Sequence, residues 1–214
     1  ESLVIILNTP AHNPTGYSLT LEDWDHVIAV LQEEAKCGKA IALVIDAAYI
    51  DFAGDEEEYR RFLPKLEALP ENVLPIMAYS LSKTYTLYGT RCGAMICIAK
   101  TKEIADEFKR GCEYSSRGSW SNSAKVAQVI LSRIYGEPGL LERVDKERAH
   151  YREMLIKRGR AFEEEAKKVG LKIVPFDAGF FISIPCSDPD AISAKLEKEG
   201  VFIVPLAKGL RVSV

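Results

Sequence analysis

The chain has 214 residues, of which 28% are charged and 47% hydrophobic, and its formal net charge is −3. This is the balance of an ordinary globular domain. It does not favour nucleic acid or an anionic membrane as a partner, because both select basic surfaces. No apolar run is long enough to cross a bilayer, and the five cysteines include no C-x-x-C pair. We therefore expect no disulfide framework, no metal site and a reducing, cytoplasmic setting.

Apolar runs alternate with amphipathic stretches along the first part of the chain, which predicts an α/β fold with a mostly parallel sheet. The helix after the first strand is predicted to begin at Thr20, with Asp23 three residues on, and to end at Gly38. Two further helices are predicted over 56–69 and 102–112. The predicted buried strands lie near 3–7, 40–45, 74–79 and 94–99.

Helices dominate the next stretch, and short strands follow them. The pattern predicts a helix around residues 126–134, and then one long charged helix or two in tandem over 140–169. After these comes a small α+β unit with a helix over 190–199 and strands near 172–175, 179–184, 202–204 and 210–213. We place a boundary near residue 145, which gives a partial large domain over 1–145 and a partial small C-terminal domain over 146–214.

Three motifs that follow predicted strands carry side chains suited to chemistry. They are NTPAHNPTG at 8–16, DAAY at 46–49 and SLSKTYTLYGTRCG at 80–93. Ligands of open α/β sheets bind beyond the carboxyl ends of the strands, so we expect the motifs to converge. In the third motif, two serine hydroxyls and Arg91 suit a phosphate, and Lys83 is left as an amine nucleophile for a carbonyl.

The order of these motifs resembles that of the class I aminotransferases, which are fold-type I enzymes that use pyridoxal 5′-phosphate. Residues 80–93 are most similar to the aspartate and aromatic branch, and the similarity extends to GLRVS at 209–213. The resemblance implies transamination between an amino acid and a 2-oxo acid, and a homodimer in the full-length parent. Compared with the family, roughly the N-terminal half and a final helical segment are absent. We therefore expect a fragment that turns over poorly by itself.

The resemblance also assigns roles toward the cofactor. Lys83 is expected to form a Schiff base with it and then to act as the general base that moves the substrate proton. Asp46 is expected to keep the pyridine nitrogen protonated, and Tyr49 and Asn13 to hold the phenolate oxygen. Lys83, Asp46 and Tyr49 are thus the expected catalytic residues. The expected phosphate ligands are Ser80, Ser82 and Arg91.

Two arginines are the candidates for recognising the substrate, together with Asn13. Arg211 resembles the arginine that grips the α-carboxylate in a bidentate pair. Arg117 resembles the arginine that the aspartate branch sends into the neighbouring subunit's site to bind a distal carboxylate, which would favour dicarboxylate substrates. The surrounding stretch departs from that pattern, because Trp120 replaces a tyrosine and Ser123 stands where a proline is common. Binding of a different group, or a local contact, is the alternative for Arg117.

Two other functions compete with transamination. One is a lyase or decarboxylase of the same fold and cofactor. Carbon–sulfur lyases of this fold usually show an acidic residue and a histidine where this chain has AAY at 47–49, so the motif favours transamination. The other is a non-catalytic fragment that binds the cofactor as a sensor. The complete set of asparagine, aspartate, tyrosine, lysine and arginine indicates instead that the parent is an enzyme.

Overall fold

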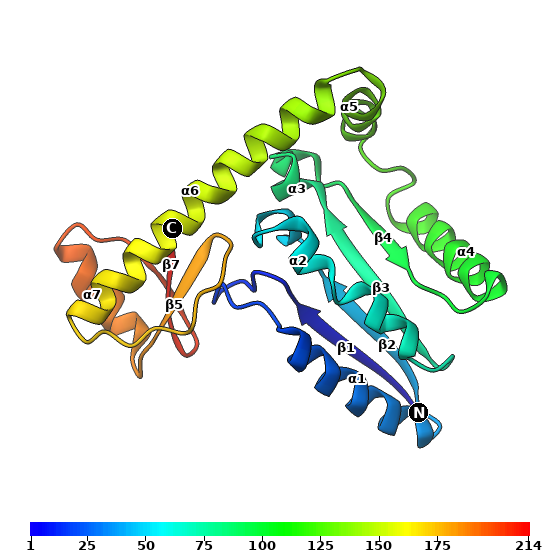
Figure 1. Ribbon diagram of the computed structural model, residues 1–214, viewed down its shortest axis with the longest axis horizontal. Coiled ribbons are helices and arrows are strands. Elements are labelled where there is room, and N and C mark those ends of the chain that lie inside the picture. Colours follow the sequence, from blue (N-terminus) through cyan, green and yellow to red (C-terminus); the bar gives the residue numbers. More distant parts are fainter.

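The computed structural model describes residues 1–214, with every side chain except that of Glu56. A four-stranded sheet and a separate three-stranded sheet are connected by a long helix that runs diagonally across the molecule (Figure 1). Helices flank the larger sheet, and the architecture is the α/β class predicted from the sequence. None of the described helices combines the length and the apolar composition needed to cross a lipid bilayer.

The larger sheet has the order β1-β2-β3-β4. Its first three strands are parallel and the fourth is antiparallel to β3. In the parallel register Asn8 lies opposite Asp46, and Asp46 lies opposite Ala78, so the carboxyl ends of three strands meet at one edge. The strands span β1 (Ser2–Asn8), β2 (Ala40–Asp46), β3 (Val73–Ser80) and β4 (Gly93–Cys97).

Helix α1 (Leu21–Lys36) covers one face of this sheet and begins at the predicted capping box. The Asp23 amide donates to Thr20 Oγ1 at 3.1 Å, and the Thr20 amide donates to Asp23 Oδ2 at 2.9 Å. Such a cap is worth about 1 kcal/mol. Alternate β2 residues pack with the apolar stripe of α1 in one core cluster. The opposite face of the sheet exposes Val4 and Ile6, whose exposed fractions are 63% and 68%.

The helix predicted over 56–69 is wrong as a single element. It is divided into α2 (Glu56–Arg60) and a 3₁₀ helix, η2 (Leu63–Ala68). Pro64 lies at the start of η2, where it lacks the N–H that a continuous helix would use and restricts the residue before it. The break lets Phe62 stack on Trp24, with ring centroids 4.5 Å apart.

Three short turns surround the carboxyl edge of the sheet: η1 (Ile50–Phe52), α3 (Leu81–Thr84) and η3 (Tyr88–Thr90). Longer helices follow β4, namely α4 (Lys102–Ser119), α5 (Lys125–Gly136) and α6 (Leu140–Lys168). Helix α4 continues beyond the predicted end at 112 and buries none of its residues. The predicted tandem alternative for 140–169 is not adopted, because α6 is one continuous helix, and residue 145 lies within it.

The smaller sheet has the order β5-β7-β6 and is antiparallel throughout. The strand predicted at 172–175 is wrong: Val174 donates one hydrogen bond to the Ser183 carbonyl at 2.9 Å, but Pro175 has no N–H to continue a ladder. The strand predicted at 202–204 begins two residues farther along the chain, as β6. The elements are β5 (Phe181–Pro185), α7 (Pro189–Lys198), β6 (Val204–Leu206) and β7 (Gly209–Ser213).

The loop after β1 packs against the smaller sheet and so connects the two parts of the molecule. Ser183 Oγ donates to the Pro14 carbonyl at 2.9 Å, and the Asp177 amide donates to the Gly16 carbonyl at 2.9 Å. Gly16 has φ +76°, and a Cβ there would lie 2.4 Å from the Phe176 ring. Only glycine fits this approach without strain, and the loop that carries Asn13 is thereby fixed in place.

Candidate active site

Four polar side chains from distant segments meet beyond the carboxyl edge of the larger sheet. Asn13 Nδ2 donates to the Tyr49 hydroxyl at 3.3 Å. Arg211 Nη1 donates to Asn13 Oδ1 at 3.1 Å. Lys83 Nζ lies 5.5 Å from the centroid of the Tyr49 ring. The loops after β1, β2 and β3 and the strand β7 therefore each contribute one member of the cluster.

Lys83 lies in the single turn α3, directly after β3, and is half-buried. Its Nζ lies 4.4 Å from the centroid of the Tyr88 ring. Burial and the positive charge of Arg91 lower the pKa of Lys83, although the negative charge of Asp46 opposes them. A lysine with a depressed pKa holds more of the neutral amine near neutral pH, and only the neutral amine is a nucleophile or a base.

Tyr49 is buried, with 6% of its surface exposed. Its ring lies 5.6 Å from that of Phe180 and 6.2 Å from that of Phe181, between centroids. Burial raises the pKa of Tyr49, and the hydrogen bond from Asn13 partly opposes the rise. In these surroundings the hydroxyl keeps its proton and can donate a hydrogen bond to a ligand oxygen.

Asp46 ends β2 and lies close enough for its charge to act on both Lys83 and Tyr49. Its Oδ1 accepts a hydrogen bond from the Ala48 amide at 3.2 Å. Asn8 Nδ2 donates to the Asp46 carbonyl at 3.0 Å, which fixes the ends of the two strands against each other. The carboxylate is thus held at the carboxyl end of β2, where it could form an ion pair with a cationic ring nitrogen.

Ser80, Ser82 and Arg91 form a second group beside Lys83. Ser80 Oγ accepts from the Ser82 amide at 3.2 Å and so caps α3. Arg91 Nη1 donates to Ser82 Oγ at 3.2 Å and to the Tyr88 carbonyl at 2.8 Å. Each serine uses its oxygen as an acceptor here and keeps a proton to donate. A guanidinium and two hydroxyls on one turn can bind a phosphate.

Arg211 has an unmet hydrogen-bonding requirement. Its guanidinium carbon lies 4.3 Å from the centroid of the Phe181 ring. Its Nε is buried and has no hydrogen-bond partner among the described residues. An unsatisfied buried donor costs about 1–3 kcal/mol, so the site favours a ligand that can accept from this face of the guanidinium, as a carboxylate does.

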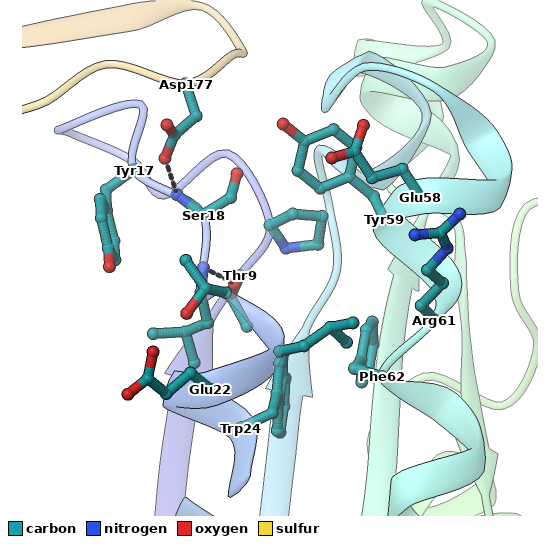
Figure 2. Close-up of a pocket in the computed structure, with 14 residues that line it drawn as sticks. Thr9, Tyr17, Ser18, Glu22, Trp24, Glu58, Tyr59, Arg61, Phe62 and Asp177 are labelled. Atoms are coloured by element: carbon teal, nitrogen blue, oxygen red, sulfur yellow. Dashed lines mark hydrogen bonds between the residues drawn. The ribbon is translucent and has the colours of Figure 1, made fainter. Parts of the chain in front are cut away.

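Two of the cavities include site residues predicted from the sequence. One of about 490 Å³ is lined by Lys83, by aromatic residues such as Phe52 and Tyr88, and by residues of α5 and α6. Another of about 810 Å³ lies between β4 and α4 and includes Arg91. A third, of about 510 Å³, lies between the start of α1 and α2 (Figure 2). It contains none of the site residues predicted from the sequence, and the bond from the Ser18 amide to Asp177 at 2.8 Å lies at its rim.

Arg117 does not join the cluster within one chain. It lies in the last turn of α4. This helix lies beyond β4, on the side of the larger sheet away from α1 (Figure 1). Its side chain is exposed, and its Nη1 donates to Ser121 Oγ at 3.3 Å. The expected role was in a neighbouring subunit, so the position within one chain leaves that expectation untested.

One buried charged residue beside the site was not predicted from the sequence. Asp51 lies in η1, two residues after Tyr49, and is 7% exposed. Its carboxylate accepts hydrogen bonds from Tyr79 and Thr84, which flank Lys83 on either side. The only signal in the sequence is a carboxylate between Ile50 and Phe52, in an otherwise apolar run.

Comparison with known proteins identifies the family. A sequence model described as "Aminotransferase class I and II" matches residues 1–214. The chain belongs to this family. It is similar to a solved aminotransferase from Anaerococcus prevotii, with 40% identity and a TM-score of 0.94, over 98% of this chain and 51% of that one. This similarity also confirms the predicted fold, since the two chains share the architecture along almost the whole of the present sequence.

Two curated relatives carry different substrate names. An aromatic amino acid aminotransferase of Cutibacterium acnes is 28% identical over 99% of this chain and 53% of its own length. A mitochondrial aspartate aminotransferase of Schizosaccharomyces pombe is 28% identical over 66% of this chain and 31% of its own length. The matched part of the chain thus spans about half the length of the Cutibacterium acnes relative and about a third of the Schizosaccharomyces pombe relative.

Proposed function

We propose that this chain carries the cofactor-binding and proton-transferring residues of a pyridoxal-phosphate-dependent aminotransferase, which moves an amino group between an amino acid and a 2-oxo acid. The observation that carries the proposal is the half-buried amine of Lys83, with its lowered pKa, beside the hydrogen-bonded series Tyr49–Asn13–Arg211. The family match over the whole chain supports the same reaction.

The donor set fits pyridoxal phosphate group by group. Asp46 is a carboxylate for the ring nitrogen, Tyr49 and Asn13 offer donors for the phenolate oxygen, and Lys83 is an amine for the aldehyde carbon. The phosphate would be held by Arg91, Ser80 and Ser82. Pyridoxal phosphate, when bound, supplies an electron sink for the electrons released from the substrate Cα–H bond.

The chain's own residues then have distinct tasks. Lys83 would hold the cofactor covalently and, when displaced by the substrate amine, would move the proton at Cα as general base. The lowered pKa of Lys83 suits this task, because a base works best near the operating pH. Asp46 would keep the positive charge on the ring nitrogen, because a nearby anion raises the pKa of that group.

Arg211 would bind the substrate α-carboxylate. Its stacking on Phe181 and its bond to Asn13 fix the plane of the guanidinium, and the unpartnered Nε leaves a donor for the ligand. Because Asn13 bonds to both Arg211 and Tyr49, the position of the carboxylate and that of the ring oxygen would be set by one amide.

We also propose that these 214 residues turn over poorly by themselves and that the complete enzyme is a cytoplasmic homodimer. The chain spans about half of its relatives, and one face of its larger sheet exposes Val4 and Ile6. Exposed apolar patches of this kind mark surfaces that pack against other polypeptide. A loss of preorganisation of about 1 Å can cost about a hundredfold in rate. The five cysteines are free, which supports a reducing compartment.

The substrate side chain is a separate question, on which the relatives' names divide between aromatic amino acids and aspartate. We propose that Arg117 favours a dicarboxylate by reaching a neighbouring subunit's site, since its side chain is exposed and available to another chain. Replacing Arg117 with alanine would then raise KM for aspartate selectively and leave KM for an aromatic donor unchanged. Equal effects on both donors would remove this part of the proposal.

The experiment that tests the reaction uses the protein and any longer natural polypeptide that contains this sequence. Each is incubated with pyridoxal phosphate, and amino donors are screened against 2-oxoglutarate and oxaloacetate. We expect 2-oxo acid to form from the donor in the longer polypeptide and the rate to vanish in Lys83→Ala. Absence of any amino transfer, or transfer that is unaffected by Lys83→Ala, would overturn the proposed function.

A further inference from the structure

The carboxylate of Asp51 is a buried hub between the segments that carry Tyr49 and Lys83. Its Oδ2 accepts a hydrogen bond from the Tyr79 hydroxyl at 2.8 Å and from Thr84 Oγ1 at 2.7 Å. Its Oδ1 accepts from Arg60 Nη2 at 3.0 Å. Charged oxygens in such surroundings form the stronger class of hydrogen bond, so all three contacts restrict where their partners can lie.

Two of these partners flank the lysine on either side. Thr84 directly follows Lys83 in α3 and is 4% exposed. Tyr79 lies four residues before Lys83, near the end of β3. The turn between them is therefore tied at both ends to one carboxylate.

On the other side, Asp51 is joined to Tyr49 by a short, ordered link. Both belong to the turn around η1, where the Phe52 amide donates to the Tyr49 carbonyl at 2.9 Å and the Ile50 amide donates to the Ala47 carbonyl at 3.1 Å. A displacement of Asp51 would therefore change the separation between the Tyr49 ring and Lys83 Nζ, which is 5.5 Å to the ring centroid.

We propose that Asp51 is a positioning residue, which fixes the turn carrying Lys83 relative to Tyr49 through its hydrogen bonds to Thr84 and Tyr79. The inference rests on the proposed function, in which Lys83 is the reactive amine, and it adds a residue that touches neither substrate nor cofactor. The role is transmitted entirely through Thr84 and Tyr79.

The charges around Asp51 come from two helices. Arg60 reaches it from α2, and Arg148 approaches from α6 across a cavity of about 210 Å³ that Asp145 and Arg152 also line. Burial lowers the pKa of Arg148, but the negative charges of Asp51 and Asp145 outweigh it and the net change is upward. Arg148 also lies over the Tyr85 ring, at 5.7 Å from its centroid, so the residue after Thr84 is held as well.

A role in stability alone is the competing explanation, because breaking one partner of a buried ion pair destabilises most folds. If Asp51 serves stability alone, replacing it lowers the free energy of unfolding and leaves the pKa of Lys83 in the folded protein unchanged. If Asp51 acts by position, loosening the turn exposes Lys83 and moves its pKa up, toward that of a solvated lysine. If Asp51 acts on Lys83 only as a nearby negative charge, removing that charge moves the pKa of Lys83 down.

The test measures the reactivity of Lys83 in the protein without cofactor. Acetic anhydride labels amines in proportion to their neutral fraction, and mass spectrometry compares Lys83 with the exposed Lys36 across a range of pH.

Thr84→Val removes one hydrogen bond without changing side-chain size, whereas Thr84→Ser keeps the hydroxyl. Asp51→Asn and Tyr79→Phe alter the other members of the hub. Asp25→Asn, which removes a surface carboxylate of α1 that pairs with Lys65, is the matched control.

We expect the labelling of Lys83 relative to Lys36 at neutral pH to fall by about three- to tenfold in Thr84→Val and Asp51→Asn. A tenfold fall corresponds to a rise of about one unit in the pKa of Lys83. Thr84→Ser and Asp25→Asn should behave as the unmodified protein. Unchanged labelling in both hub variants, or an increase in Asp51→Asn alone, would overturn the inference while leaving the proposed function intact.

Folding is followed in parallel by circular dichroism. If Asp51→Asn does not fold, Thr84→Val and Tyr79→Phe decide the matter, and if none of the three folds, the hub serves folding and the inference fails. Failure of the proposed function would be recognised separately, because pyridoxal phosphate would then not attach to Lys83 in the unmodified protein.

Discussion

Arg211 and Asn13 are 198 positions apart in the chain, yet the guanidinium donates to the side-chain amide at 3.1 Å. Asn13 donates in turn to Tyr49, so a residue of the smaller sheet is connected to the loops that end β1 and β2. The smaller sheet thereby takes part in the site directly. Any motion of β7 relative to the larger sheet would change the position of the amide that Tyr49 contacts.

Replacing Arg211 with lysine is expected to weaken binding of the α-carboxylate. Lysine keeps the charge but loses the planar fork and the stacking on Phe181. A hydrogen bond to a charged group is worth about 1.5–3 kcal/mol, so kcat/KM for an amino donor should fall by about 10- to 150-fold. Steady-state kinetics on a longer natural polypeptide that contains this sequence would measure this. Arg133→Lys, on the exposed surface of α5, is the control that should leave kcat/KM unchanged.

The rigid loop around Asn13 gives a stability prediction with a matched control. Gly16 and Gly38 have similar positive φ values of +76° and +78°. A Cβ at Gly16 would meet the Phe176 ring at 2.4 Å, whereas one at Gly38 would meet nothing within 4 Å.

Gly38→Ala should therefore cost only the left-handed strain, about 1–2 kcal/mol of unfolding free energy. Gly16→Ala should cost about 1–3 kcal/mol more through overpacking. Urea unfolding of the two variants checks the difference. Equal losses would show that the packing of Phe176 on the loop is not as described.

The lowered pKa of Lys83 predicts how stability depends on pH. Between its lowered pKa in the folded protein and its ordinary pKa of 10.5, Lys83 binds fewer protons in the folded protein than in the unfolded chain. Stability contributed by this group therefore rises as pH increases through that window. Lys83→Met removes the term, so the variant should be the more stable one at neutral pH, and its advantage should shrink as pH approaches 10.5. The effect is small because solvent screens a half-buried amine. Chemical unfolding over a pH series measures it, and an advantage that grows with pH would contradict the assigned direction.

Local features of the fold were predictable from the sequence. The capping box of Thr20 and Asp23 depends on two residues in one turn, and the parallel strands are read from apolar runs of the right length. The break at Pro64 was predictable in principle, since proline interrupts a helix and restricts the residue before it. The strand near residue 174 was predicted wrongly, because its apolar pattern runs into Pro175, which has no N–H to continue a ladder.

The contacts within the site were less predictable because they join residues far apart. Nothing in the spacing of Asn13 and Arg211 indicates that they touch, and their expected roles came from the resemblance to a family. Asp51 had no such help. Its partners lie 28 and 33 positions away, and a carboxylate in an apolar run gives no indication of which hydroxyls it will meet.

The most direct measurement is to treat the protein, and any longer natural polypeptide that contains this sequence, with pyridoxal phosphate and borohydride, and to locate the reduced adduct by mass spectrometry. We expect one dominant adduct at Lys83, absent in Lys83→Arg and unaffected by Lys100→Arg, which changes an exposed lysine in the segment after β4. Catalysis should fall with it by at least about 10²–10⁴-fold, the contribution of a lost general base. Adducts spread over the surface lysines, or a full yield in Lys83→Arg, would contradict the assignment of Lys83 and with it the function proposed for this chain.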